Sequence, residues 1–484
     1  MTAVPVQLST RETPAQRSAD EGRTPGGEEG IGWQIWALSG VLFFVYALVS
    51  LRTHERLLSN SYDLGIFEQA IRSYAHGELP VSELKGPDFP LLGDHFHPVL
   101  ALLAPFYRVW PSPKTLLVAQ AALVAASAIP LARWARRSLG LPAGLVIGAG
   151  YGLSWGVASA VGFDFHEVAF AAPLLACSLC ALGQGRLRAA AVWALPLLLV
   201  KEDLGLTVTA IGLVIAWRGN RRIGLATAGI GLAGALLTLF LVLPAFSPTG
   251  SFGYWDRLGE PAGAGQGLTG MLYHHTIGLI TPVTKVSTLL FVLAPTLFLA
   301  LRSPLMWVAV PTLAWRFASN DSFNWGTGFH YSLVLMTIAF AAFVDALVRR
   351  GHVASLRRYL AGSLAVTLLL LPQFPLWQLV QPATWRSTPR LGAARDVMRL
   401  IPDGATVQAS TNLVPQLTNR TSVSLFGWAG SRPDPEWIMV DTQIPDDRRW
   451  PLSDTAEQAA LNTARANGYT EVADQDGFVL LQRN

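Results

Sequence analysis

Apolar stretches and short polar loops alternate along most of the chain, from residue 33 to residue 380. A helix needs about 20 apolar residues to cross the hydrocarbon core of a bilayer, so the pattern predicts about eleven membrane-spanning helices. We expect them at 33–51, 114–131, 141–161, 168–182, 189–200, 204–217, 223–246, 286–301, 305–317, 332–348 and 360–380. The run 99–110 is too short to span. It is expected to be a re-entrant or interfacial helix, or an extension of the next span.

The loops between these runs differ in charge, and this difference predicts the orientation of the chain. Alternate loops are rich in arginine, whereas the loops between them hold most of the Asp, Glu and His of this region. The arginine loops contain Arg133, Arg136, Arg137, Arg186, Arg188, Arg218, Arg221, Arg222, Arg302, Arg349, Arg350, Arg357 and Arg358. Because an excess of arginine marks the cytoplasmic side, we predict a cytoplasmic amino terminus and a carboxyl end outside the membrane.

Composition agrees with a membrane protein. Hydrophobic residues make up 51% of the chain and charged residues only 14%, against roughly 25% charged residues in soluble domains. The net charge of +4 comes largely from the predicted cytoplasmic loops, so it indicates topology and not a nucleic-acid partner. Residues 1–30 are polar and rich in Gly, Pro and Glu, which is typical of a disordered tail, here cytoplasmic. A transmembrane domain, 31–384, with a long first outer loop, 52–98, follows the tail.

The composition changes after the last apolar run, and residues 385–484 are expected to form a small α/β domain outside the membrane. Strands are predicted at 405–409, 437–440, 471–473 and 478–481, and a helix at 456–466. The last two strands could pair across Asp476-Gly477, which is a favoured hairpin turn. The sequence therefore predicts an α-helical polytopic membrane protein with an extracytoplasmic α/β domain at its carboxyl end.

The first outer loop carries two groups of chemically active residues. Asp63 follows the first span closely and could act as a general base on an acceptor hydroxyl, or simply cap the following helix. Further along, Asp94, His95 and His97 could ligate a divalent metal or hold a phosphate. Alternatively, this second group is a solvated interfacial loop. Glu68 lies five positions after Asp63 and would be offset from it on a helix.

Three further clusters fall on the same predicted side. Asp164, His166 and Glu167 lie between two spans, either as site residues or as a polar connector. Lys201 and Glu202 interrupt an apolar stretch, where they could serve catalysis or only pair with each other or with Asp203 at a helix turn. A later loop ends in His330-Tyr331 and contains Trp, Asn and Asp. Such residues are typical of a sugar site, although the tryptophans could equally form an interfacial belt.

These motifs together resemble a known bacterial membrane family, domain of unknown function 2079. The resemblance rests on the runs 61–70, 94–98, 165–167, 201–203, 330–331 and 401–404. The family is similar to the GT-C superfamily of glycosyltransferases, which use polyprenyl-phosphate sugars and carry an acidic catalytic residue in a long first outer loop. The resemblance implies a location in the bacterial plasma membrane. It also implies that Asp63 is the catalytic carboxylate, with Glu68 or Asp94 as residues that could share the role.

The resulting functional hypothesis is transfer of a sugar from polyprenyl phosphate to a glycan or lipid acceptor of the cell envelope. Arg52, Arg56 or Lys201, with His95 or His97, would offset charge on the leaving phosphate. The substrate-binding candidates are Tyr62, His95, His97, Asp164, His166, Glu167, Lys201, Glu202, His330 and Tyr331, and the candidate ligands for a divalent metal are Asp94, His95 and His166. The alternatives are a transporter or lipid flippase, and a non-catalytic envelope scaffold. A transporter would be favoured by inverted repeats, which the sequence does not display.

Overall fold

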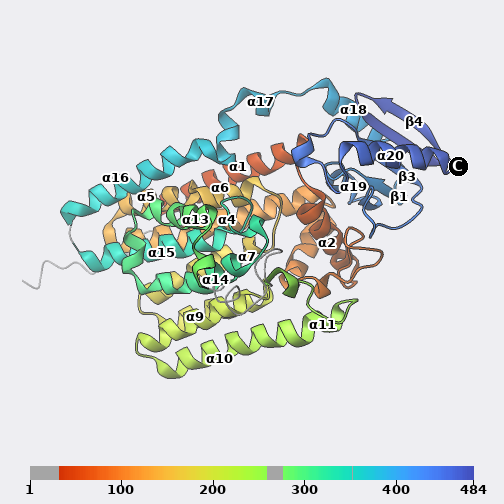
Figure 1. The fold of residues 1–484 in the computed structure, drawn as a ribbon. Helices are drawn as coiled ribbons and strands as arrows, with labels where there is room; N and C mark the ends of the chain where they lie inside the picture. Colours follow the sequence, from red (N-terminus) through yellow and green to blue (C-terminus); the bar gives the residue numbers. More distant parts are fainter. Residues whose placement is uncertain (1–31, 259–275, 352) are drawn as a thin grey trace, which may run out of the picture.

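The computed structural model describes residues 32–258, 276–351 and 353–484, so the predicted tail, 1–30, lies outside the described residues. Figure 1 shows a bundle of helices that lie roughly side by side, with a smaller α/β unit at one end of it. The first loop, 52–98, lies at that same end, beside the α/β unit. The two regions that are most distant in the sequence are therefore neighbours in space.

The helices of the bundle and of the first loop differ widely in length. In chain order they are α1 (Trp33–Glu55), α2 (Ile66–His76), α3 (Ala104–Val109), α4 (Pro113–Leu139), α5 (Leu141–Gly152), α6 (Trp155–Gly162), α7 (Val168–Gly183), α8 (Leu187–Ala194), α9 (Leu204–Trp217), α10 (Arg221–Leu237), α11 (Leu243–Phe246), α13 (Val283–Leu293), α14 (Val310–Ala318), α15 (Leu333–Arg350), α16 (Val353–Leu370) and α17 (Pro382–Trp385).

Few of these helices have the length and apolarity of a complete span. Among the described residues three do, namely α1, α4 and the continuous stretch Arg221–Phe246, and α5 with α6 forms a fourth candidate bent by 48°. Several other predicted spans are shorter helices continued by 3₁₀ turns that contain a proline, such as Pro196 and Pro295. Proline removes a backbone donor and interrupts the α-helix. The number of spans therefore remains a prediction, whereas the predominantly helical membrane fold is observed.

The α/β unit contains one five-stranded sheet with the order β2-β1-β3-β5-β4. Its elements are α18 (Pro389–Met398), β1 (Thr406–Ala409), α19 (Val414–Leu417), β2 (Ser422–Leu425), β3 (Trp437–Asp441), α20 (Asp454–Ala466), β4 (Tyr469–Gln475) and β5 (Phe478–Arg483). Strand β1 pairs in parallel with β2 and β3, whereas β5 is antiparallel to β3 and β4. The predicted hairpin across Asp476-Gly477 is thus present, and β2 is the strand that the sequence pattern did not predict.

The α/β unit and the first loop share a single hydrophobic core. Leu57, Ile66, Leu84 and Leu91 of the loop pack in one cluster with residues of α18, β1, α19, β2, β3 and β5. Gly65 permits this contact, because a Cβ atom there would lie 2.7 Å from Leu84 and 3.3 Å from Val414. The first loop is therefore held in place by the last hundred residues of the chain as well as by α1.

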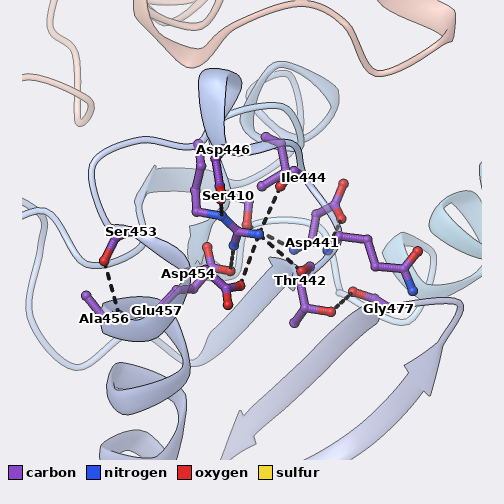
Figure 2. Close-up of polar contacts among 12 residues, drawn as sticks. Ser410, Asp441, Thr442, Ile444, Asp446, Ser453, Asp454, Ala456, Glu457 and Gly477 are labelled. Atoms are coloured by element: carbon purple, nitrogen blue, oxygen red, sulfur yellow. Dashed lines mark hydrogen bonds and ion pairs between the residues drawn. The ribbon is translucent and has the colours of Figure 1, made fainter.

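A buried arginine organises the segment between β3 and α20. The Arg449 side chain is only 5% exposed and donates hydrogen bonds to the carbonyls of Thr442 and Ile444, at 3.2 and 2.9 Å. It also forms ion pairs with Asp454, at 3.2 Å, and with Glu457 on α20 (Figure 2). These contacts fix the segment around Arg449. Its neighbours Arg448 and Trp450 contact the first loop.

Candidate functional site

Asp63 has an unusual backbone conformation in the connection between α1 and α2. Its φ and ψ angles are 82° and −91°, within the segment Ser61–Gly65. This is close to the rare γ-turn geometry with positive φ, which is strained for a residue with a side chain. Such strain persists only where the surrounding structure fixes it, and it concentrates at functional sites. The geometry therefore singles out Asp63 within the loop.

A chain of alternating charges leads from Asp63 into the bundle. The Nε2 atom of His166 lies 3.5 Å from Oδ1 of Asp63, and its Nδ1 atom lies 2.6 Å from Oε2 of Glu167. The other oxygen of Glu167 lies 2.9 Å from Nζ of Lys201. Asp63 is the most accessible of the four, with a side chain 28% exposed, whereas that of Glu167 is 1% exposed.

The charges in this chain stabilise one another. Burial by itself lowers the pKa of His166, but the Glu167 carboxylate and the contacts with Asp63 and Glu167 raise it above its usual value. Burial would raise the pKa of Glu167, and the neighbouring His166 and Lys201 bring it well below its usual range instead. An imidazolium thus lies between two carboxylates, with an ammonium group behind the second one.

His166 is fixed from several sides. Its backbone N–H donates to Oε1 of Gln120 at 2.9 Å, and its ring stacks on His330 with the centroids 3.3 Å apart. Phe67 contacts the other edge of the ring, at 5.0 Å between centroids. Burial and the nearby His166 and Lys201 cations hold the pKa of His330 well below its usual value, so His330 is a neutral stacking partner. The buried His330 ring therefore packs on His166 and fixes its orientation.

Asp164 lies beside this chain but in a different electrostatic state. Its Oδ2 atom accepts a hydrogen bond from the Asn60 N–H at 2.7 Å, and its side chain is buried. Burial raises the pKa of Asp164 to about 7, and the nearby Asp63 carboxylate contributes in the same direction. Asp164 therefore fixes the loop between α1 and Asp63 through the Asn60 backbone.

The second group of the first loop is held by Lys85 and Tyr254. Asp94 forms an ion pair with Nζ of Lys85 at 2.9 Å and accepts a hydrogen bond from the Tyr254 hydroxyl at 2.9 Å. Burial would raise the pKa of Asp94, but the nearby His95 and Lys85 and the two hydrogen bonds lower it to about 2. Gly93 permits this arrangement, since a Cβ atom there would meet the Phe246 backbone at 2.6 Å.

His95 is oriented by the carboxylate of Glu202. The Nδ1 atom of His95 lies 2.7 Å from Oε1 of Glu202, whose other oxygen accepts the Phe96 N–H at 3.1 Å. Burial would raise the pKa of Glu202, but His95 and Lys201 lower it, so the carboxylate is ionised and Nδ1 must carry the hydrogen. The Nε2 atom of His95 has no hydrogen-bond partner within the described part of the chain.

The two groups are parts of one polar network. Lys201 and Glu202 are neighbours in sequence, so the chain from Asp63 and the pair with His95 meet at this turn. The Phe67 ring contacts both His97 and His166. Burial lowers the pKa of His97 to about 4, so its imidazole is neutral, and its ring packs against Phe67. The structure thus connects Asp63, Asp94, His95 and His166 through a few intermediate side chains.

The α/β unit covers this region from the other side. The ring of Tyr62, next to Asp63, contacts Trp450 at 4.8 Å and Trp428 at 6.5 Å between centroids. Arg448 donates to the Leu58 carbonyl at 3.0 Å, and Nζ of Lys85 lies 5.2 Å from the centre of the Tyr62 ring. Residues from both ends of the sequence therefore surround the strained turn.

Some candidates lie outside this network. Glu68 is completely buried and accepts a hydrogen bond from Tyr107, so its carboxylate does not face the region of Asp63 that a substrate could reach. The candidate metal ligands Asp94, His95 and His166 are not gathered around one point. Among the described residues there is no group of three or more His, Cys, Asp or Glu side chains that could hold a metal ion.

Two residues of the site were not predicted from the sequence. Lys85 lies in a polar loop among other charged residues, and nothing in the pattern distinguishes it. Arg316 near the end of α14 is buried, and its guanidinium donates to the carbonyls of Asn324 at 2.8 Å, Gly326 at 2.9 Å and Tyr331 at 3.3 Å. It thereby fixes the loop before His330. A cation within an apolar run is a signal that could have identified it.

The fold and the site together define a polytopic helical membrane protein with a charged site between the bundle and a carboxyl-terminal α/β unit. The chain belongs to the family of predicted membrane proteins DUF2079, whose model matches residues 53–480. This confirms the family that the motifs indicated. A search of curated proteins finds no match.

Two solved structures of ArnT from Cupriavidus metallidurans have a similar fold. The structure bound to undecaprenyl phosphate matches with a TM-score of 0.53 and 13% identity, covering 93% of this chain and 98% of ArnT. The apo structure matches with a TM-score of 0.52 and 13% identity, covering 93% and 97%. Similarity at this level of identity shows that the fold is shared over almost the whole chain.

Proposed function

We propose that this protein is a membrane glycosyltransferase that moves a sugar from a polyprenyl-phosphate donor to an envelope acceptor. The reaction would take place at the outer leaflet of the plasma membrane. The observation that carries the proposal is the strained Asp63, held by His166 at one carboxylate oxygen. Support comes from the shared fold with ArnT, whose structure was solved with undecaprenyl phosphate bound.

Asp63 is the proposed general base. Its Oδ1 atom faces His166, whereas Oδ2 has no polar partner among the described residues and is available to a hydroxyl. In the reaction, the acceptor oxygen would bond to the anomeric carbon as the bond from that carbon to the phosphate oxygen breaks. The hydroxyl proton would pass to Oδ2 of Asp63, and polyprenyl phosphate would leave. The distance of 3.5 Å to His166 is long, as is common before substrate binds.

His95 and Lys201 are the proposed partners of the leaving phosphate. Glu202 orients His95, so that the Nε2–H of the imidazolium form can donate a hydrogen bond to a phosphate oxygen. Lys201 adds positive charge behind the site, and the Glu167 carboxylate is its counter-ion. Positive groups that are fixed in advance stabilise charge that develops on a leaving group. Arg52 and Arg56 are not part of this proposal, because they line a separate cavity that contains none of the residues named here.

The α/β unit is the proposed site of acceptor binding. Tyr62, Trp428 and Trp450 present aromatic rings beside Asp63. Trp450 is 45% exposed, so its ring surface can contact a sugar. Aromatic rings bury a large apolar area and suit the flat apolar faces of sugar rings. A site built from both the bundle and the α/β unit would bring donor and acceptor together at the strained turn.

The substitution Asp63→Asn tests the proposal. General-base catalysis typically contributes about 10²–10⁴-fold, so the variant should lose transfer by that factor while keeping its shape. Purified protein in proteoliposomes would be supplied with radiolabelled polyprenyl-phosphate sugars and a cell-envelope extract as acceptor, and transfer of label from polyprenyl phosphate to the acceptor would be measured. Glu78→Gln is the matched control, because Glu78 is an exposed carboxylate of the same loop.

Thermal stability of both variants would be measured in parallel. A correctly folded Asp63→Asn variant with normal transfer would show that Asp63 is not the base. Absence of transfer in the wild-type protein, with transport of the intact lipid instead, would favour a flippase.

A further inference from the structure

A second charged cavity lies away from the site around Asp63. It has a volume of about 400 Å³ and lies where the end of α1 meets the start of α4 and the helices α18 and α19 of the α/β unit. Its lining residues are Arg52, His54, Glu55, Arg56, Lys114, Ser387, Leu391, Arg395 and Gln416. None of the residues assigned to glycosyl transfer is among them.

Positive charge dominates this cavity. Four cationic side chains, Arg52, Arg56, Lys114 and Arg395, face a single carboxylate, Glu55. Glu55 holds Arg52 with one oxygen at 2.8 Å and Lys114 with the other at 3.2 Å. The Arg56 side chain has no ion-pair or hydrogen-bond partner in the part of the chain that the structure describes. The cavity is therefore a rigid frame with uncompensated positive charge, which is suited to an anion.

The cations come from both parts of the molecule. Arg52 also donates to the Thr384 carbonyl at 2.8 Å, which fixes its guanidinium. Arg395 belongs to α18 and donates to the Glu55 carbonyl at 3.3 Å. An anion bound here would contact the end of the first span and the α/β unit at the same time.

The cavity continues an apolar face of α1 that is exposed along the helix. Val41, Phe44 and Leu48 are 59%, 67% and 42% exposed. The spacings of three and four residues from Val41 to Arg52 place all four side chains on one face of the helix. Trp385, 49% exposed, lies next to Arg52, whose guanidinium carbon is 5.8 Å from the centre of its ring. Exposed tryptophan beside cations is typical of the level of lipid head groups.

We propose that this cavity binds the phosphate of an anionic membrane lipid, with the lipid chain lying along the exposed face of α1. A soluble anion would need only the four cationic side chains of the cavity for binding. The continuous apolar face that ends in the cavity favours an amphipathic ligand instead. Bound lipid would hold the α/β unit against the end of the first span. This function is independent of the proposed glycosyl transfer, because no residue is shared between the two sites.

Lipid binding by the full-length protein tests the inference. The protein in neutral detergent would be titrated with phosphatidylglycerol, with phosphatidylcholine and with inorganic phosphate. Dissociation constants would be obtained from native mass spectra and from thermal shifts. We expect phosphatidylglycerol to bind and to raise the unfolding temperature, and inorganic phosphate to bind at least tenfold more weakly. Equal binding of phosphatidylcholine, or equally tight binding of inorganic phosphate, would overturn the proposal.

Charge-removing variants locate the site. Arg56→Gln and Arg395→Gln should each weaken phosphatidylglycerol binding about tenfold, the size expected when one charge-assisted contact is lost. Arg399→Gln is the matched control, since Arg399 follows α18, is 75% exposed and, among the described residues, forms an ion pair only with Asp396. It should bind lipid as the wild type does, and so should Asp63→Asn. Unchanged affinity in both Arg56→Gln and Arg395→Gln would show that lipid does not bind in this cavity.

Discussion

The substitution Glu167→Gln removes the centre of the charge chain behind Asp63. The Glu167 carboxylate contacts Lys201 at 2.9 Å and His166 at 2.6 Å, and its side chain is 1% exposed. Glutamine keeps the shape and removes the negative charge. The Lys201 side chain, 11% exposed, is then left without its closest counter-charge. Breaking a buried ion pair in this way costs about 3–5 kcal/mol.

A loss of this size is a large fraction of the roughly 5–15 kcal/mol that stabilises a typical folded domain. The unfolding temperature in detergent should therefore fall clearly. Lys201→Met should destabilise the protein as well, because Glu167 keeps only His166 as a partner. The double variant should be destabilised by less than the sum of the two single variants, with a coupling of about 0.5–3 kcal/mol, as expected for residues in direct contact.

The same substitution should change the pH dependence of transfer. In the wild-type protein, Glu167 raises the pKa of His166 against the effect of burial. Without Glu167 this pKa falls, and the imidazolium that orients Asp63 is lost at a lower pH. The alkaline limb of the pH–rate profile should therefore move to lower pH. An unchanged unfolding temperature together with an unchanged profile would refute the charge chain as described.

Three further predictions concern other parts of the chain. Glu68→Gln should keep the rate of transfer within a few-fold of wild type, because Glu68 is buried against Tyr107. A loss of transfer as large as that of Asp63→Asn would show that Glu68 belongs to the catalytic site. Asp164 has a pKa raised by burial from its usual value to about 7, so stability should fall as pH rises toward 7, by on the order of 4 kcal/mol. The stability of Asp164→Asn, measured by thermal unfolding, should not show this decrease with pH. An equal decrease in the variant would show that Asp164 is not its cause. For topology, an outside thiol reagent should label Ser453→Cys and not Asn220→Cys, and labelling of Asn220→Cys would reverse the predicted orientation.

Patterns within short segments were informative about local structure and family. The turn Asp476-Gly477 predicted the β4–β5 hairpin, and the motifs around Asp63, His95 and His166 indicated the family that the comparisons confirm. Both inferences depend on residues that are close in sequence, where spacing determines geometry directly. Strand β2, in contrast, is an edge strand that pairs with β1, and its short segment contains serine at alternate positions, which weakens the hydrophobic signal.

Long-range contacts were the part that the sequence did not predict. Lys85 acquires its role only because folding brings it to Asp94, further along the same loop, and to Tyr254, which belongs to a different loop. The burial of Glu68 follows from Tyr107, which belongs to a helix that the pattern marked only as too short to span. Similarly, proline-containing 3₁₀ turns divide apolar runs that composition alone would count as single spans.

The core that Leu57, Ile66 and Leu84 share with the α/β unit has a consequence for biosynthesis. A ribosome makes the first loop several hundred residues before it makes β1, β3 and β5. In the predicted orientation, the loop therefore waits across the membrane without its packing partner. We expect Asp63 to reach its strained conformation only after the last strand has been translocated. Protease protection of the first loop, measured on stalled chains of increasing length, should then appear only once residue 484 has been exported. Synthesis of an incomplete chain would consequently insert a bundle into the membrane without creating a working site.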